Sequence, residues 1–134
     1  MSIWTEPLLA ASVFLVDDFT AARSALRDSL NRHPKIDVVG TAASVAAAVD
    51  GIRQSRPRVA VIDDQLPDGT GIDLCEILKN NDASVISILY AGTLSPTRYR
   101  DAQQAGASAV LLKQIDTGQL VRTILQLTAP GRAS

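Results

Sequence analysis

Four aspartates and one lysine are the residues of this chain whose types and positions fit a reactive site. Each stands at the end of an apolar run; they are Asp17, Asp18, Asp63, Asp64 and Lys113. In open α/β sheets, ligands bind outside the carboxyl ends of the strands, so an acid at such an end is a candidate reactive group. Carboxylates act as nucleophiles and bind cations. Four acids close to one lysine should leave one acid protonated near neutral pH or attract a cation.

The segment around Asp63 shows most clearly how the chain leaves a strand. The apolar run 59–62 is typical of a strand that is buried on both faces of a parallel sheet. Asp63 and Asp64 end this run, and Pro67 and Gly69 then favour a turn. Asp63 is therefore expected to face a crevice at the edge of the sheet.

Five strand patterns alternate with five helix patterns along the chain. Short apolar runs predict strands at 13–16, 36–41, 59–62, 85–90 and 109–112. Between and after these runs, apolar residues recur at three- and four-residue spacing, which predicts helices. The alternation implies a parallel sheet covered on both faces by helices, with right-handed crossovers. If the first, third and fifth strands end close together, the acids and Lys113 meet in one pocket.

Several residues are expected to begin, end or orient these helices. Ser44 and the pair Ser95-Pro96 are N-terminal signals, Gly106 is a helix-ending glycine, and Asp116 with Gln119 is expected to cap the last helix. Two helices have residues that are expected to face inward. These are Phe19, Ala22, Leu26 and Leu30 in the first helix, and Tyr99, Ala102 and Ala105 in the fourth.

Length and composition limit the functions that the chain can have. It has 134 residues, of which 46% are apolar and 4% aromatic, and its net charge is −1. The length and apolar content suffice for one hydrophobic core. The near-neutral charge provides no general basic field for binding nucleic acid or a membrane, and the low aromatic content provides no stacking surface for single-stranded nucleic acid. The only cysteine, Cys75, is expected in or near the core. We expect a cytoplasmic protein with an extension at 1–11, one domain at 12–128 and a linker-like tail at 129–134.

The order of these motifs resembles a known family. An Asp-Asp pair, then Asp-x-x-Leu-Pro-x-x-x-Gly from Asp63, then Lys113, on five strand–helix units, looks like the receiver domain of bacterial two-component response regulators. The resemblance covers Val13 to about Leu127. Within the family, the stretches Leu-Pro-Asp-Gly-Thr-Gly-Ile-Asp-Leu-Cys and Ala-Gly-Ala-Ser are most similar to receivers that precede a helix-turn-helix DNA-binding domain. The resemblance implies a flavodoxin-like (βα)5 fold with strand order 2-1-3-4-5.

The resemblance also implies which acid reacts. Asp63 matches the phosphoacceptor, because it stands four residues before Pro67. Asp64 does not match, and it is expected to be an exposed neighbour that points away from the pocket.

The metal and phosphate positions are implied in the same way. Asp17 and Asp18 match the acidic pair that binds Mg²⁺ together with the phosphoacceptor, and Gln65 matches the position whose backbone carbonyl also contacts the metal. Mg²⁺ offsets the repulsion between a carboxylate and an incoming phosphoryl group. Lys113 and Gly92 match the positions that contact the phosphoryl group.

Two positions depart from the family's pattern. Ala91 stands where the family has a Thr or Ser that contacts the phosphoryl group, and Val110 stands where it has an aromatic switch residue. A register shifted by one residue would place Tyr90 at the hydroxyl position, but a phenol is too long to replace a Thr without rearrangement. Phosphorylation is therefore expected to change the distant face, formed by 95–105, the fifth strand and 117–127, only weakly.

The expected function is phosphorylation at Asp63 by a sensor histidine kinase, followed by control of a transcriptional output. The domain would catalyse only its own phosphoryl transfer and dephosphorylation, and it could form a homodimer; it is not expected to bind nucleic acid or a membrane itself. One alternative is an atypical pseudo-receiver that responds to protein contacts or another ligand, as Ala91 and Val110 permit. Another is an aspartate-nucleophile phosphatase, although Asp17-Asp18-Phe19 lacks the Asp-x-Asp spacing of that class.

Overall fold

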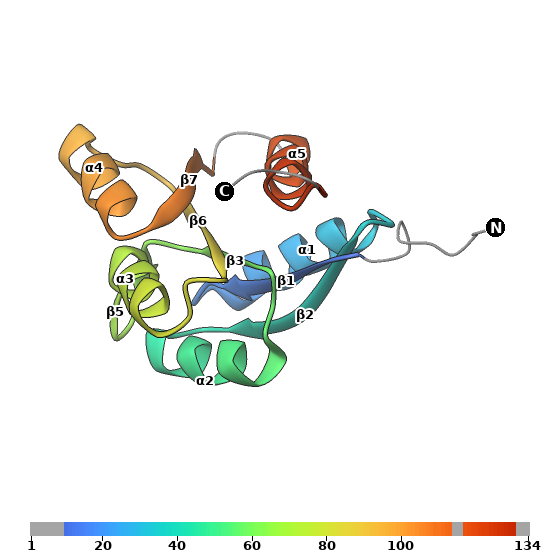
Figure 1. Cartoon of the computed structure of the whole chain (residues 1–134), viewed down its shortest axis with the longest axis horizontal. Coiled ribbons are helices and arrows are strands. Elements are labelled where there is room, and N and C mark those ends of the chain that lie inside the picture. The colour runs from blue at the N-terminus through green and yellow to red at the C-terminus, as the bar shows by residue number, and fades with distance from the viewer. Residues whose placement is uncertain (1–9, 114–116, 131–134) are drawn as a thin grey trace.

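The centre of the molecule is a five-stranded parallel sheet, seen in a computed structural model that describes residues 10–113 and 117–130 (Figure 1). Its strands are β1 (Ala11–Val16), β2 (Ile36–Ala42), β3 (Val59–Ile62), β6 (Ile86–Ala91) and β7 (Ala107–Leu112). They lie in the order β2-β1-β3-β6-β7, and each neighbouring pair is parallel. Because β6 and β7 are the fourth and fifth strands of this sheet, the expected order 2-1-3-4-5 is confirmed.

Helices and one small hairpin connect the strands. The helices are α1 (Thr20–Asn31), α2 (Val45–Ser55), α3 (Gly71–Asn81), α4 (Pro96–Gln104) and α5 (Thr117–Leu127). The hairpin, β4 (Gln65–Leu66) with β5 (Gly69–Thr70), forms the turn between β3 and α3. Of the helices that the structure describes, none is long and apolar enough to cross a membrane.

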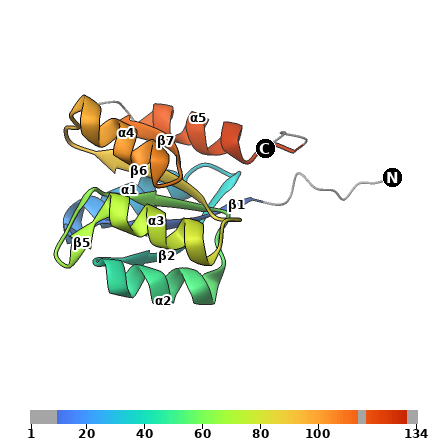
Figure 2. The same cartoon turned by 60° about the vertical axis from the view of Figure 1, so that its left-hand side comes forward.

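Helices cover both faces of the sheet, which gives the protein two apolar layers (Figures 1 and 2). On one face, α2, α3 and α4 pack through residues such as Ile52, Leu74 and Ala102. On the other face, α1 and α5 pack through residues such as Leu30 and Ile124. Because β3 lies in the middle of the sheet, all four of its residues are buried, as the continuous apolar run predicts.

The expected helix caps of α2 and α4 are confirmed. Ser44 Oγ accepts a hydrogen bond from the backbone N–H of Ala47 at 3.1 Å, and Ser95 Oγ accepts one from Arg98 at 3.1 Å. Gly106 has a φ of +104°, a conformation that only glycine adopts without strain at the end of a helix. The expected cap at Asp116, and the expectations for residues 1–9 and 131–134, lie outside the described residues.

Two inward-facing residues were predicted wrongly. Phe19 is 64% exposed, because α1 begins only after it and the ring lies outside the apolar face of the helix. Tyr99 is 44% exposed. The small Ala102 and Ala105 are buried and let α4 lie close to the sheet, so the larger ring of Tyr99 remains at the edge of this contact.

Candidate functional site

The candidate site lies at the edge of the sheet where the carboxyl ends of β1, β3 and β7 are found, with the end of β6 between those of β3 and β7. Asp17 and Asp18 follow β1, Asp63 follows β3, and Lys113 follows β7. The strand ends are held by backbone hydrogen bonds between neighbours: Asp63 N–H donates to the carbonyl of Val16 at 2.9 Å, and Lys113 N–H donates to the carbonyl of Ala91 at 2.8 Å. The parallel sheet therefore brings together residues that are far apart in the sequence, as the alternation of strands and helices predicts.

Three carboxylates form a cluster at this edge. One oxygen each of Asp17, Asp18 and Asp63 lies within 4.8 Å of the other two. Asp17 is buried, Asp63 is half-buried and Asp18 is exposed, so the cluster opens to solvent on one side. Hard oxygen ligands with one open side are the donor set that suits Mg²⁺, which keeps several of its waters when bound. The residues present therefore fit this metal ion.

Lys113 contributes the positive charge of the site. Its Nζ lies 3.2 Å from Asp17 Oδ2 and 3.3 Å from Asp63 Oδ2. Burial raises the pKa of Asp63 above its ordinary value; the nearby Lys113 opposes this rise, and the negative charge of Asp17 adds to it. For Lys113, burial acts to lower the pKa, but the charges of Asp63 and Asp17 outweigh it and raise the pKa. The ammonium group is therefore charged at neutral pH and faces both acids.

Asp17 has two roles in the structure, one at the start of the first helix and one in the charged cluster. Its Oδ1 accepts a hydrogen bond from the N–H of Phe19 at 2.9 Å, which shapes the turn into α1. Its Oδ2 faces Lys113. The guanidinium group of Arg23 in α1 donates to the backbone carbonyl of Asp17 at 2.6 Å. One side chain thus orients the first helix while one of its oxygens remains in the cluster.

The turn that follows Asp63 is attached to its surroundings by two contacts that sequence reasoning missed. Asp68 accepts hydrogen bonds from the N–H groups of Val45 at 2.7 Å and Ala46 at 3.0 Å, at the start of α2. These two bonds lower the pKa of Asp68. At Gly71, the first residue of α3, a Cβ atom would collide with the backbone carbonyl of Asp63 and lie 2.7 Å from Leu89 Cδ1. Only glycine allows α3 to begin this close to the site.

A cavity of about 310 Å³ opens beside Asp63 and is lined by residues at and just after the carboxyl ends of β3, β6 and β7. The lining residues are Asp63, Asp64, Gln65, Ala91, Gly92, Thr93 and Lys113. All positions that the resemblance assigns to phosphate contacts are present, and so is Gln65, whose N–H lies 3.5 Å from Asp63 Oδ1. Thr93 adds a hydroxyl group that the motif did not predict, two positions after Ala91.

The two atypical positions lie on the face of the sheet that α4 covers. Ala91 is buried at the end of β6 and lines the cavity. Val110 packs into the apolar layer that contains Ala102. Tyr90 packs on the opposite face, in the apolar layer of α1 and α5, and does not line the cavity beside Asp63, so the shifted register would not bring its hydroxyl group there. At this end of β6, the position facing the cavity therefore carries a methyl group where the family has a hydroxyl.

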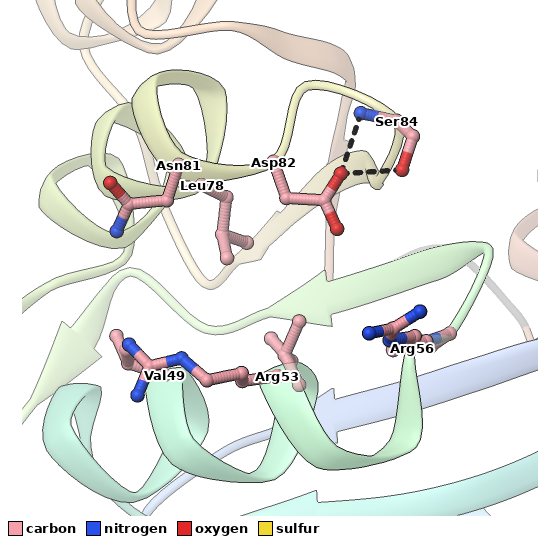
Figure 3. Close-up of a pocket in the computed structure, with 9 residues that line it drawn as sticks. Val49, Arg53, Arg56, Leu78, Asn81, Asp82 and Ser84 are labelled. Carbon is pink, nitrogen blue, oxygen red and sulfur yellow. Dashed lines mark hydrogen bonds between the residues drawn. The ribbon is translucent and has the colours of Figure 1, made fainter.

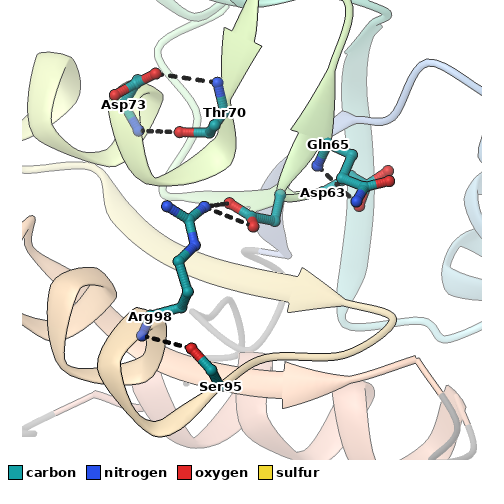
Figure 4. A network of polar contacts seen from close by, with 7 residues as sticks. Asp63, Gln65, Thr70, Asp73, Ser95 and Arg98 are labelled. Carbon is teal, nitrogen blue, oxygen red and sulfur yellow. Dashed lines mark hydrogen bonds and ion pairs between the residues drawn. The ribbon is translucent and has the colours of Figure 1, made fainter.

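Asp64 is not the exposed neighbour that was expected. Its side chain is only 13% exposed, and both carboxylate oxygens accept hydrogen bonds from Nη2 of Arg98, at 2.8 Å and 2.7 Å. In Figure 4 the Arg98 side chain extends from α4 toward the segment that holds Asp63. The hydrogen bond to Asp64 raises the pKa of Arg98, so the guanidinium group stays charged. A helix that packs close to the end of β3 provided a partner for Asp64 that no sequence motif indicated.

Two further features lie away from this edge. Cys75 is 1% exposed, and burial raises its pKa to about 12, so it is a core residue as expected. A separate hollow of about 410 Å³ lies between α2 and α3, with Arg53 and Arg56 on one side (Figure 3). Asp82 faces it but is bound by Ser84, through the hydroxyl group at 2.5 Å and the N–H at 3.1 Å. The clustered acids and Lys113 lie elsewhere, at the strand ends.

Comparison with known proteins agrees with this geometry. The chain is 40% identical over 117 residues to the DNA-binding transcriptional activator DevR/DosR of Mycobacterium tuberculosis, covering 87% of this chain and 54% of that protein. It is 31% identical over 118 residues to a protein-glutamate methylesterase/protein-glutamine glutaminase of a Nocardioides species, covering 86% of this chain and 32% of that protein. The chain thus spans about half or less of the length of these relatives.

One solved structure and one family model identify the family to which the chain belongs. The signal receiver domain of the response regulator NarL from Mycobacterium tuberculosis has a TM-score of 0.86 and 27% identity, covering 92% of this chain and 99% of that one. The model of the response regulator receiver domain matches residues 13–125. These residues include β1 to β7 almost completely, together with the acidic cluster and Lys113. The chain therefore belongs to the response regulator receiver domain family.

Proposed function

We propose that this receiver domain accepts a phosphoryl group on Asp63 from a sensor histidine kinase, with Mg²⁺ bound by Asp17, Asp18 and Asp63. The backbone carbonyl of Gln65 would complete the protein ligands. The observation that carries the proposal is the position of Lys113, whose Nζ lies 3.3 Å from one oxygen of Asp63 beside a cluster of three acids. A nucleophilic carboxylate, a cation and a metal-binding set in one cavity are what phosphoryl transfer to an aspartate requires.

In the proposed step, a carboxylate oxygen of Asp63 attacks the phosphorus of a phosphohistidine. A P–O bond forms as the P–N bond breaks, and the electron pair of that bond stays on the imidazole nitrogen. Lys113 is placed to pair with a phosphoryl oxygen, and the N–H of Gly92 is a further candidate donor at the cavity wall. When bound, Mg²⁺ would neutralise negative charge on the phosphoryl group. Hydrolysis of the acyl phosphate by water would return Asp63 and inorganic phosphate, so the domain would catalyse its own dephosphorylation.

The output that the domain controls is part of the same proposal. The relative from Mycobacterium tuberculosis is a DNA-binding transcriptional activator, and this chain matches about half of its length. We infer that the receiver regulates transcription through a DNA-binding domain in the complete protein, in a cytoplasmic system. Homodimerisation of the receiver would be compatible with such an output.

A pseudo-receiver is a second candidate, and one observation favours it. Ala91 lines the cavity where the family has a hydroxyl group, so the phosphoryl group would lack one hydrogen bond. Such a bond to a charged group contributes about 1.5–3 kcal/mol. In this alternative the acidic cavity would remain, but protein contacts or another ligand would regulate the domain.

Mass spectrometry after incubation with acetyl phosphate and Mg²⁺ distinguishes the two candidates. We expect one phosphoryl group on the native chain, none on Asp63→Asn, and normal labelling of Asp64→Asn, the neighbouring control. Absence of labelling on the native chain would favour the pseudo-receiver. Labelling that persists in Asp63→Asn but disappears in Asp64→Asn would show that the wrong aspartate was assigned.

A further inference from the structure

The ion pair between Asp64 and Arg98 joins the end of β3 to the first turn of α4. Nη2 of Arg98 donates to both oxygens of Asp64, at 2.8 Å and 2.7 Å, over a separation of 34 positions in the sequence. Within the described residues, the other two guanidinium nitrogens, Nη1 and Nε, make no hydrogen bond. Arg98 is held by one of its nitrogens and keeps donors for further negative charge.

The first turn of α4 has few other attachments to the domain. Ser95, Pro96 and Thr97 are exposed, whereas the buried residues Ala102 and Ala105 lie at the other end of the helix. Ser95 is the N-cap of this helix: its Oγ accepts a hydrogen bond from the N–H of Arg98, and its backbone carbonyl accepts one from the N–H of Tyr99. These bonds shape the turn but do not attach it to the sheet. Among the described side chains of this turn, Arg98 makes the polar contact that does so.

Residue 63 is the immediate neighbour of this ion pair in the sequence and in the cavity. Asp63 and Asp64 are consecutive, and both line the cavity of about 310 Å³. Lys113 balances part of the charge of Asp63, but it is shared with Asp17. Asp73 and Asp101 also attract Arg98, from α3 and from its own helix. Against this constant background, additional negative charge at position 63 is expected to increase the attraction on Arg98, because screening is weak for half-buried groups.

We propose that Arg98 is a positioning residue of this site: through Asp64, it makes the attachment of the first turn of α4 depend on the charge at residue 63. The contact offers a charge-based route to α4 where Ala91 and Val110 lack the hydroxyl group and the aromatic ring. More negative charge holds the turn more firmly, and loss of charge loosens it. The inference rests on the proposed function only where it names the phosphoryl group as the natural source of that charge.

The test varies the charge at residue 63 in three steps and measures amide hydrogen exchange by NMR. Asp63→Asn removes the charge, Asp63 carries one, and the phosphoryl mimic beryllofluoride adds negative charge at residue 63; Mg²⁺ is present at the same concentration in all three measurements. Exchange at Tyr99 and Arg100 reports on the first turn of α4, and amides of β1 and β3 report on global stability. In the native background, exchange at the turn is expected to slow with each step by roughly two- to fivefold, the effect of a partly exposed charge pair.

The same series is measured in Arg98→Gln, Arg98→Lys and Arg100→Gln. Arg100 is exposed on the same helix, so its substitution is the matched control and should leave the dependence on residue 63 intact. The dependence should disappear in Arg98→Gln and return in part in Arg98→Lys, which keeps the charge. An ion pair with a purely structural role would instead change exchange by the same factor whatever residue 63 carries.

Two results would overturn the inference: no dependence on residue 63 in the native background, or a dependence of equal size in Arg98→Gln. Failure of beryllofluoride to bind would count against the proposed phosphoacceptor role of Asp63. It would leave the comparison of Asp63 with Asp63→Asn, made in both backgrounds, to decide the role of Arg98.

Discussion

Nζ of Lys113 lies 3.3 Å from Oδ2 of Asp63, so the cation at the end of β7 directly faces the proposed nucleophile at the end of β3. This contact does not fully compensate the carboxylate. Burial and the charge of Asp17 still raise the pKa of Asp63 above its ordinary value of 3.8. The site therefore holds a negative charge that the folded protein disfavours, which has consequences for stability, metal binding and pH dependence.

Asp63→Asn should stabilise the protein at pH 7 in the absence of Mg²⁺. The folded state favours the protonated form of Asp63, so ionisation costs stability above the raised pKa, and this cost disappears as the pH falls to 3.8 and below. We expect a higher Tm for Asp63→Asn at pH 7, with a gain that shrinks on acidification; a change of about 1 kcal/mol shifts Tm by about 2–8 °C in small domains. Calorimetry from pH 7 to 3.5 measures it. Asp50→Asn, on the exposed side of α2, is the control, and a lower Tm of Asp63→Asn at pH 7 would contradict the assignment.

Millimolar Mg²⁺ should raise the Tm of the native chain, because a ligand that binds only the folded state stabilises it by mass action. At a concentration ten times its Kd, the gain is about 1.4 kcal/mol. Asp18→Ala should remove most of this gain, since Asp18 contributes one of the three clustered oxygens. Asp28→Ala, an exposed acid on α1, should keep it. The same Mg²⁺ response in Asp18→Ala as in the native chain would argue against this cluster as the metal site.

Asp68→Asn should weaken the start of α2. The charged carboxylate accepts from Val45 and Ala46, and these bonds lower its pKa, so its contribution to stability is present above pH 3.8 and is lost as the pH falls through the lowered pKa. We expect a lower Tm at pH 7, faster amide exchange at Val45 and Ala46, and a smaller difference from the native chain near pH 3. Asp37→Asn serves as the control on an exposed strand position. Equal exchange at both amides in Asp68→Asn and the native chain would exclude this capping role.

Gly71→Ala and Gly92→Ala should differ sharply in effect. A Cβ at Gly71 would meet the carbonyl of Asp63 and Leu89, whereas a Cβ at Gly92 would meet nothing within 4 Å. Overpacking of this kind costs about 1–3 kcal/mol, so we expect Gly71→Ala to lower the stability to urea and to slow phosphorylation, while Gly92→Ala keeps the native stability. Urea unfolding and acetyl phosphate labelling measure the two effects. Similar stabilities of the two variants would show that α3 can move away from Asp63 without cost.

The sequence by itself predicted the sheet and the residues at its edge. Apolar runs and helical periodicity are local properties of the chain, so the five strands, the caps at Ser44 and Ser95, and the buried Cys75 could be predicted and are confirmed. The carboxyl ends of parallel strands point in one direction, which is why Asp17, Asp63 and Lys113 were expected to meet. Their clustering in the structure follows from the strand order together with the long side chain of Lys113, which reaches Asp63 past the end of β6.

Only the tertiary structure decided how the neighbouring side chains are used. Asp64 was expected to be exposed, but Arg98 lies against it from a helix 34 positions further along the chain. Asp68 caps α2 over a separation of 23 positions. Such contacts depend on how closely each helix packs against the sheet and in which direction it turns its side chains. Periodicity does not encode these distances, so the contact of Asp64 with Arg98 of α4 became visible only in the folded molecule.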